Sequence, residues 1–198
     1  LVAQTTSEQR SGGGLVGSLG TMQVDNGNIS VGEFHSNGEF LTLGESATAE
    51  EHGVFSDPLY FSFDVRDLFA VPDFSRTAEM LNTVWQRSEY ACDIDGVIAI
   101  DPLFIQEMVR INGDITLDNG QVLTGDNTAE FMLNGIYKAF DPDTQNMYFE
   151  YVASAVMDGA FSNMTMDKMM QIAQAMGTLA EGRHFYAYTV HEDEAEYF

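Results

Sequence analysis

The sequence predicts a three-layer α/β domain with a mixed β-sheet, helices on both faces and two β-hairpins. Three observations support this fold class. Asn-Gly pairs at 26–27 and 119–120 are strong hairpin signals. The continuously apolar run at 97–100 is typical of a strand covered on both faces. Other segments carry apolar residues at helical spacing. We expect all 198 residues, 1–198, to form a single domain.

The first part of the chain predicts strands followed by a loop. Residues 1–10 predict one strand and residues 15–24 a second. The chain turns at Asn26-Gly27 and returns as a strand over 29–36. Residues 36–57 mix Gly, Ser, Glu and Thr, so we expect a loop with a short helix around 46–52.

The middle of the chain alternates helix and strand. Residues 73–90 have helical spacing, and either Asp73 or Ser75 can cap that helix. The buried strand leads directly into Asp101-Pro102, an N-cap followed by proline in the first helical turn. This next helix ends at Asn112-Gly113, before the second hairpin.

The last third predicts mainly helices. One helix follows Thr124 and extends to Phe140. The helix over 144–161 has apolar residues around most of its circumference, so we expect it to be mostly buried. Residues 184–190 predict a final strand, followed by an acidic helix or tail over 191–198.

The last long helix, before that strand, is rich in methionine. We expect one of its sides to face the core, since a methionine stripe at helical spacing is more often core than a docking groove. That side comprises Met166, Met169, Ala173, Met176 and Ala180.

The charge balance excludes one class of partner. The chain has 31 acidic and 8 basic residues, a net charge of −23 spread over both halves. Such a surface repels phosphate backbones and anionic lipid headgroups. We therefore expect no nucleic-acid partner, and the simplest role of the charge is solubility.

The cysteine count and the hydropathy exclude further kinds of protein. Cys92 is the only cysteine, which excludes an internal disulfide and multi-cysteine zinc sites. We expect it to be a small buried core residue. No run of 18 apolar residues occurs. Because the chain starts at Leu1 without methionine, we expect it to be a piece of a longer protein.

Known catalytic motifs are missing. The glycines of 12–17 formally match G-x-G-x-x-G, but this loop leads into a predicted strand instead of the helix that dinucleotide binding requires. Neither H-E-x-x-H nor G-x-S-x-G occurs. His184 is expected to be a hydrogen-bonded structural residue. The sequence therefore predicts no catalytic residues, no cofactor and no metal site.

Five residues are candidates for ligand binding. Arg10 and the backbone amides of Gly12 and Gly13 could contact an anion; alternatively, Arg10 forms an ion pair, with an acid from the helix after Asp101 as the expected partner. Asp141 and Asp143 could offer oxygen ligands, or they start a helix.

Four segments carry a family resemblance: EQRSGGGLVGSLGTMQVDNGNIS, VPDFSRTAEMLNTVWQ, DGVIAIDPLFIQEMVRINGDITLDNGQVLTGDN and EGRHFYAYTVHEDEAE. Together they resemble a bacterial domain of unknown function, family 4012, over nearly the whole chain. The resemblance implies an extracytoplasmic body with a membrane tether outside this fragment. It implies no activity.

A more remote resemblance covers FIQEMVRINGDITLDNGQVLTGDNTAEFML and TQNMYFEYVASAV. These segments are similar to LytR–CpsA–Psr phosphotransferases, which transfer wall glycopolymers from polyprenyl pyrophosphate carriers. The pattern of those enzymes has arginines around the break between the two segments, where this chain has Tyr137, Lys138, Asp141 and Gln145. The chemistry is therefore not expected to be shared.

The sequence thus favours a non-catalytic extracytoplasmic domain that binds or assembles envelope components, with a glycopolymer or a protein as partner. The alternative is a wall-glycopolymer transferase. The arrangement of the arginines separates the two, because a pyrophosphate site needs three or more in one cleft.

Overall fold

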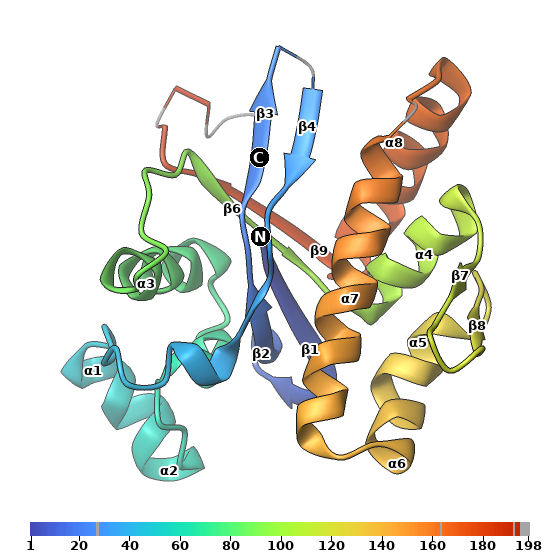
Figure 1. Ribbon diagram of the computed structural model, residues 1–198. Helices are drawn as coiled ribbons and strands as arrows, with labels where there is room; N and C mark the ends of the chain where they lie inside the picture. Colours follow the sequence, from blue (N-terminus) through green and yellow to red (C-terminus); the bar gives the residue numbers. More distant parts are fainter. Residues whose placement is uncertain (27, 163, 192, 195–198) are drawn as a thin grey trace.

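A five-stranded mixed sheet forms the centre of the computed structural model, which describes residues 1–26, 28–162, 164–191 and 193–194 (Figure 1). The strand order is β5-β2-β1-β6-β9; β1 is parallel to β6, and the other neighbours are antiparallel. The hairpins β3-β4 and β7-β8 stand apart from this sheet. The strands are β1 (Val2–Arg10), β2 (Gly13–Leu19), β3 (Met22–Asp25), β4 (Asn28–Val31), β5 (His35–Ser36), β6 (Gly96–Ile100), β7 (Ile115–Thr116), β8 (Val122–Leu123) and β9 (Phe185–Thr189).

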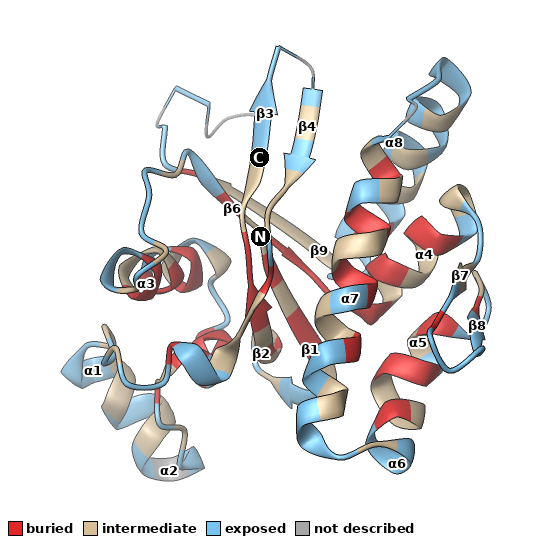
Figure 2. Ribbon diagram, in the orientation of Figure 1, coloured by how far each residue is buried: buried red, intermediate tan, exposed pale blue. Residues whose placement is uncertain are grey.

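Helices cover both faces of the sheet, which confirms the predicted three layers. The 3₁₀ helix η3 and helix α3 pack on one face, and α4 to α8 with the π-helix η4 pack on the other (Figure 1). Buried residues follow this division in Figure 2. The helices are η1 (Asn37–Glu39), α1 (Ala49–Glu51), η2 (His52–Ser56), α2 (Asp57–Leu59), η3 (Val65–Ala70), α3 (Phe74–Arg87), α4 (Pro102–Asn112), α5 (Thr128–Glu130), η4 (Phe131–Gly135), α6 (Ile136–Ala139), α7 (Pro142–Phe161) and α8 (Met166–Glu181).

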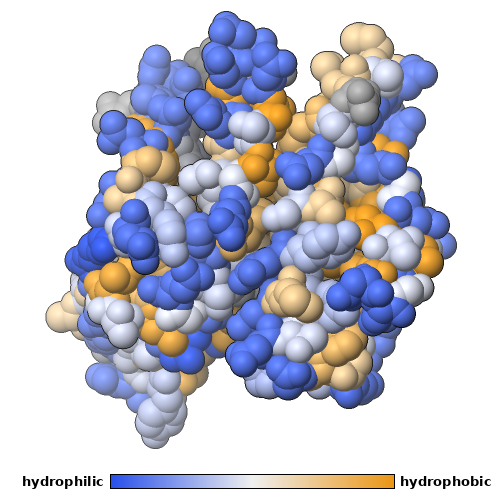
Figure 3. All heavy atoms as spheres, viewed as in Figure 1, coloured by the Kyte–Doolittle hydropathy of each residue, from blue (hydrophilic) through white to orange (hydrophobic). Residues whose placement is uncertain are grey.

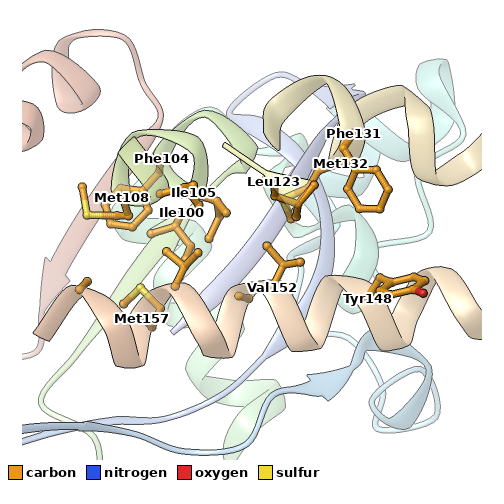
Figure 4. Close-up of a cluster of buried hydrophobic side chains, with 14 of the residues drawn as sticks. Ile100, Phe104, Ile105, Met108, Leu123, Phe131, Met132, Tyr148, Val152 and Met157 are labelled. Atoms are coloured by element: carbon orange, nitrogen blue, oxygen red, sulfur yellow. The ribbon is translucent and has the colours of Figure 1, made fainter. Parts of the chain in front are cut away.

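Strand β6 joins the two cores. Val97 and Ala99 are buried in the cluster under α3, and Ile100 is buried in the cluster under α4 and α7. Figure 4 shows Ile100 beside Ile105 and near α7. Ile98 points to the same side as Ile100 but is only half-buried. The predicted strand covered on both faces is therefore confirmed, with Ile98 as its least covered apolar residue.

Aspartates begin helices α3 and α4, as the sequence predicted. Asp73 caps α3 by accepting a hydrogen bond from the Ser75 amide at 2.9 Å. Asp101 caps α4 by accepting from the amides of Leu103 and Phe104. These contacts satisfy amides that have no partner within the helix.

The predicted strand over 15–24 is two strands in different sheets. β2 ends at Leu19 and β3 starts at Met22. The chain leaves the sheet at Gly20, whose amide donates to the Leu1 carbonyl and whose missing side chain leaves room for Phe34 and the Glu33 carbonyl. The return over 29–36 is divided in the same way, into β4 and β5.

The burial predicted for the last two long helices is partly wrong. On α7, Met147 and Tyr151 are each 49% exposed, because only one face of the helix contacts the core. On α8, Met166 is 72% and Met169 50% exposed. Met176 of the predicted side does pack against the core, beside the buried Leu179 and the partly buried Ile172 and Ala175.

Two predictions fall partly on residues outside the described ranges: the turn at Gly27 and the acidic end over 191–198. Among the described helices, none combines the length and apolar character that crossing a membrane requires.

Candidate functional site

Arg10 lies at the end of β1 and contacts Asp67 of η3. Its Nε and Nη2 atoms are each 2.9 Å from Asp67 Oδ1, while Asp67 Oδ2 accepts hydrogen bonds from the Ser62 amide and hydroxyl. The guanidinium also lies 5.1 Å from the centre of the Phe61 ring. Arg10 thus forms an ion pair. The expected partner after Asp101 was wrong, since Asp67 comes from the opposite helical layer.

The glycines beside Arg10 make close backbone contacts. The Gly12 amide donates to the Phe69 carbonyl at 2.8 Å, and its carbonyl accepts from the Tyr186 hydroxyl at 2.9 Å. A Cβ on Gly12 would lie 2.5 Å from the Val71 carbonyl oxygen, and one on Gly13 would lie 2.3 Å from Gln4 Oε1. Backbone atoms therefore leave no room for a side chain at Gly12, whereas at Gly13 the side chains of Gln4 and Phe69 would have to move. The Gly12 amide is already used in a hydrogen bond.

Asp141 and Asp143 lie at the start of α7, in the other helical layer. Asp141 accepts hydrogen bonds from the amide and hydroxyl of Thr144, and these bonds lower the pKa of its carboxyl. Asp143 is exposed in the first helical turn. The structure therefore does not join these two carboxylates with Arg10 and the glycines in one site. Ligand binding by any of the five stays a prediction.

The arginines are dispersed, and most pair with acids of their own surroundings. Arg66 contacts Asp64 at 2.6 Å, and Arg76 contacts Glu51 at 2.7 Å. Arg110 pairs with Glu107 and Asp126, and Arg87 donates to the carbonyls of Leu43 and Glu45. No arginine lines either of the two hollows described below.

A groove of about 770 Å³ lies at the end of the sheet where β1 and β6 begin. Its walls come from β3, from α3 and from the segment that leads into β6 (Figure 1). Apolar side chains line much of it, among them Leu81 and Trp85 of α3, Met22 of β3 and Val97 of β6. Its volume lies in the range of small-ligand sites.

Trp85 and Cys92 both line this groove. Trp85 is the only tryptophan of the chain and is 5% exposed. Its indole Nε1 is buried and has no hydrogen-bond partner among the described residues. Cys92 is exposed, so its expected place in the core was wrong. Its segment, between α3 and β6, lies at the groove mouth instead.

Carboxylates give the groove a negative rim. Asp93, Asp95 and Glu194 line it. Asp95 lies 3.0 Å from His191 Nε2, a contact that raises the pKa of His191, and Glu194 accepts from the Thr189 hydroxyl at 3.0 Å. No lysine or arginine lines the groove.

The lining of the groove thus combines apolar side chains with carboxylates. The groove therefore favours a ligand with positive charge and apolar groups.

A second polar cluster lies inside the fold, near Asp101. The Asp101 side chain is fully buried, and its Oδ2 lies 2.7 Å from His184 Nδ1. Gln4, Thr5 and Ser18 are also buried there, around a cavity of about 30 Å³. The cavity is too small for an organic ligand. The Asp101–His184 contact joins the start of α4 to the segment before β9, as expected for a structural histidine.

Sequence reasoning missed the groove because its walls come from segments far apart in the chain. The single tryptophan and cysteine were visible in the sequence, seven residues apart, but helical spacing assigned Trp85 only to a core-facing position. Among the described residues, no group of three or more His, Cys, Asp or Glu side chains is placed to hold a metal ion. The expectation of no metal site stays a prediction.

Comparison with known families gives one match: the family described as "Protein of unknown function (DUF4012)" matches residues 1–137. The match includes β1 to β8 and the groove residues up to Ile98. The resembling segment at 181–196 lies outside it. No curated protein and no solved structure matches the chain. Nothing in these comparisons supports the resemblance to LytR–CpsA–Psr enzymes.

Proposed function

The chain belongs to the DUF4012 family of proteins of unknown function, and from this premise we propose that it is a non-catalytic extracytoplasmic binding domain of a membrane-anchored bacterial surface protein. Its role is to bind or assemble envelope components. The extracytoplasmic location and the membrane tether rest on the family resemblance noted in the sequence.

The observation that carries the binding role is the groove beside Trp85. It has a volume of about 770 Å³, apolar walls and a carboxylate rim. A transferase acting on a pyrophosphate carrier requires cations around the phosphates, but no lysine or arginine lines this groove. The dispersed arginines likewise favour binding over glycopolymer transfer.

Cys92 offers a direct test of the location. It is the only cysteine of this chain and is exposed. We expect a membrane-impermeant maleimide to label it on intact cells of the producing bacterium after removal of the wall, with the full-length Cys92→Ser protein as control. Labelling that appears only after the cells are permeabilised would contradict the proposed location.

Calorimetry with inorganic pyrophosphate tests the non-catalytic role. We expect no saturable heat, because the net charge of −23 and the paired arginines disfavour an anion. Saturable binding, together with transfer of a glycan from a polyprenyl pyrophosphate carrier to peptidoglycan, would establish the transferase alternative.

A further inference from the structure

We propose that the groove binds an extended peptide segment of a partner protein, in which basic and apolar side chains alternate, and that this segment adds as a strand to the free edge of β3. The inference rests on the proposed binding function and specifies its ligand.

The edge of β3 provides the backbone partner. β3 pairs with β4 from Met22↔Val31 to Asp25↔Asn28, and within the described residues it pairs with no other strand. β4 packs toward α7, whereas residues 22–24 of β3 line the groove. The unpaired amides and carbonyls of β3 therefore face the groove side. Such an edge is a template for an added strand, which makes the ligand an extended peptide.

Trp85 provides the second contact. Its indole N–H is buried without a partner in the described structure, and the residue lines the groove. The apolar side chains of a peptide in the groove can cover the tryptophan and Leu81.

The rim selects the charge of the peptide. Asp93, Asp95 and Glu194 line the groove without any lysine or arginine beside them. His191 contacts Asp95, but the other two carboxylates have no cationic partner in the described part of the chain. A basic peptide is attracted to this rim. A second copy of this chain, with net charge −23, is repelled.

The single tryptophan and the single cysteine report on the groove without labels. The probe is a soluble nine-residue peptide of alternating lysine and valine, added to the domain. We expect a saturable change in Trp85 fluorescence and slower reaction of Cys92 with N-ethylmaleimide. A glutamate–valine peptide of the same length should produce neither change.

Two matched comparisons separate specific binding from general charge attraction. The double variant Asp93→Asn with Asp95→Asn should bind the lysine–valine peptide about tenfold more weakly. Asp114→Asn with Asp167→Asn changes the net charge equally but alters no residue that lines the groove, and should weaken binding of this peptide by less than about twofold. A peptide methylated on alternate backbone nitrogens keeps its charge but cannot form hydrogen bonds along one edge. Its affinity should also be about tenfold lower.

Each remaining outcome overturns the inference. Equal weakening by the two double variants would reduce the binding to charge attraction alone. Full binding of the methylated peptide would exclude strand addition, and binding without a change at Trp85 or Cys92 would place the peptide elsewhere. The cell-surface labelling and the pyrophosphate calorimetry test the proposed function separately. The peptide experiments can therefore fail while the proposed function stands.

Discussion

Arg10 and Asp67 form an ion pair in which each side chain is about 12% exposed. Replacing Arg10 with alanine leaves a largely buried carboxylate with only the hydrogen bonds from Ser62. We expect a loss of about 3–5 kcal/mol in the free energy of unfolding, measured by urea denaturation. Arg10→Lys should also destabilise the protein, because an ammonium cannot reproduce the planar fork that places Nε and Nη2 on Asp67. Unchanged stability of both variants would contradict the structural role of the pair.

Glu51 gives a prediction about pH. Its hydrogen bonds from Arg76 lower the pKa of its carboxyl from 4.5 to about 2. Because the pKa is lower in the folded state, the pair stabilises the fold fully above pH 4.5, and this stabilisation is lost as the pH falls toward 2. Glu51→Gln should cost about 1–2 kcal/mol near neutral pH, a modest value because solvent reaches part of the pair.

Urea titrations of the wild-type and Glu51→Gln proteins at a series of pH values check this prediction. The difference in unfolding free energy between the two should shrink between pH 4.5 and about pH 2. A difference that stays constant across this window would show that the Arg76 contact does not hold the carboxyl in its charged form.

The sequence predicts the roles of some single residues but not of others. Asp73, Asp101 and Asp141 were predictable as helix caps, because capping depends on the residue and its next few neighbours. The partner of Arg10 and the exposure of Cys92 depend on distant segments. Local patterns carry no signal for either.

At the scale of elements, strand β6 provides a matched pair of variants. Ile100 is completely buried, and Ile98, two residues earlier on the same face, is only half-buried. Ile100→Ala should cost about 2–5 kcal/mol, and Ile98→Ala clearly less, because solvent already covers part of that side chain. Thermal or urea unfolding measures both. Equal costs would mean that the two residues are equally covered.

Helix α8 allows a similar test of which face packs on the core. Leu179 is 6% exposed, whereas Met166 and Met169 are at least half exposed. Leu179→Ala should destabilise the protein by about 2–5 kcal/mol. Met166→Gln and Met169→Gln should each change stability by less than about 0.5 kcal/mol. A larger loss of stability for the two methionine variants than for Leu179→Ala would show that the methionines face the core.

Elements were largely predictable where periodicity and capping agree. The strand β6, the helix α4 and the hairpin β7-β8 follow each other as the sequence indicated. The packed face of α8 was only partly predictable, because the exposed Met166 and Met169 satisfy helical spacing as well as Met176, which packs on the core. Only the position of α4 and β9 decides between the faces.

At the scale of the whole molecule, net charge dominates the surface. Hydrophilic residues cover most of the face seen in Figure 3, and the net charge is −23. Self-repulsion of this size destabilises the compact state and is screened by salt. The melting temperature should therefore rise between about 0.1 M and 1 M sodium chloride. A falling melting temperature would show that the ion pairs of the arginines outweigh the repulsion.

The three-layer fold was predictable from hairpin signals and one buried strand, but the groove was not. It forms where β3 leaves the sheet at Gly20 and approaches α3 and the segment before β6. The sequence indicated one continuous strand over 15–24. Such a strand would keep residues 22–24 in the main sheet, so that they would not form a wall of the groove. The groove thus depends on a local break that apolar patterning does not encode.

Amide hydrogen exchange with the lysine–valine peptide tests the central claim most directly. Strand addition at the groove predicts slower exchange of the β3 amides at 22–25 and of the segment at 92–95 when the peptide is bound, with no change in α8 or β7-β8. Exchange that slows at other elements while β3 stays unchanged would contradict the proposed binding site.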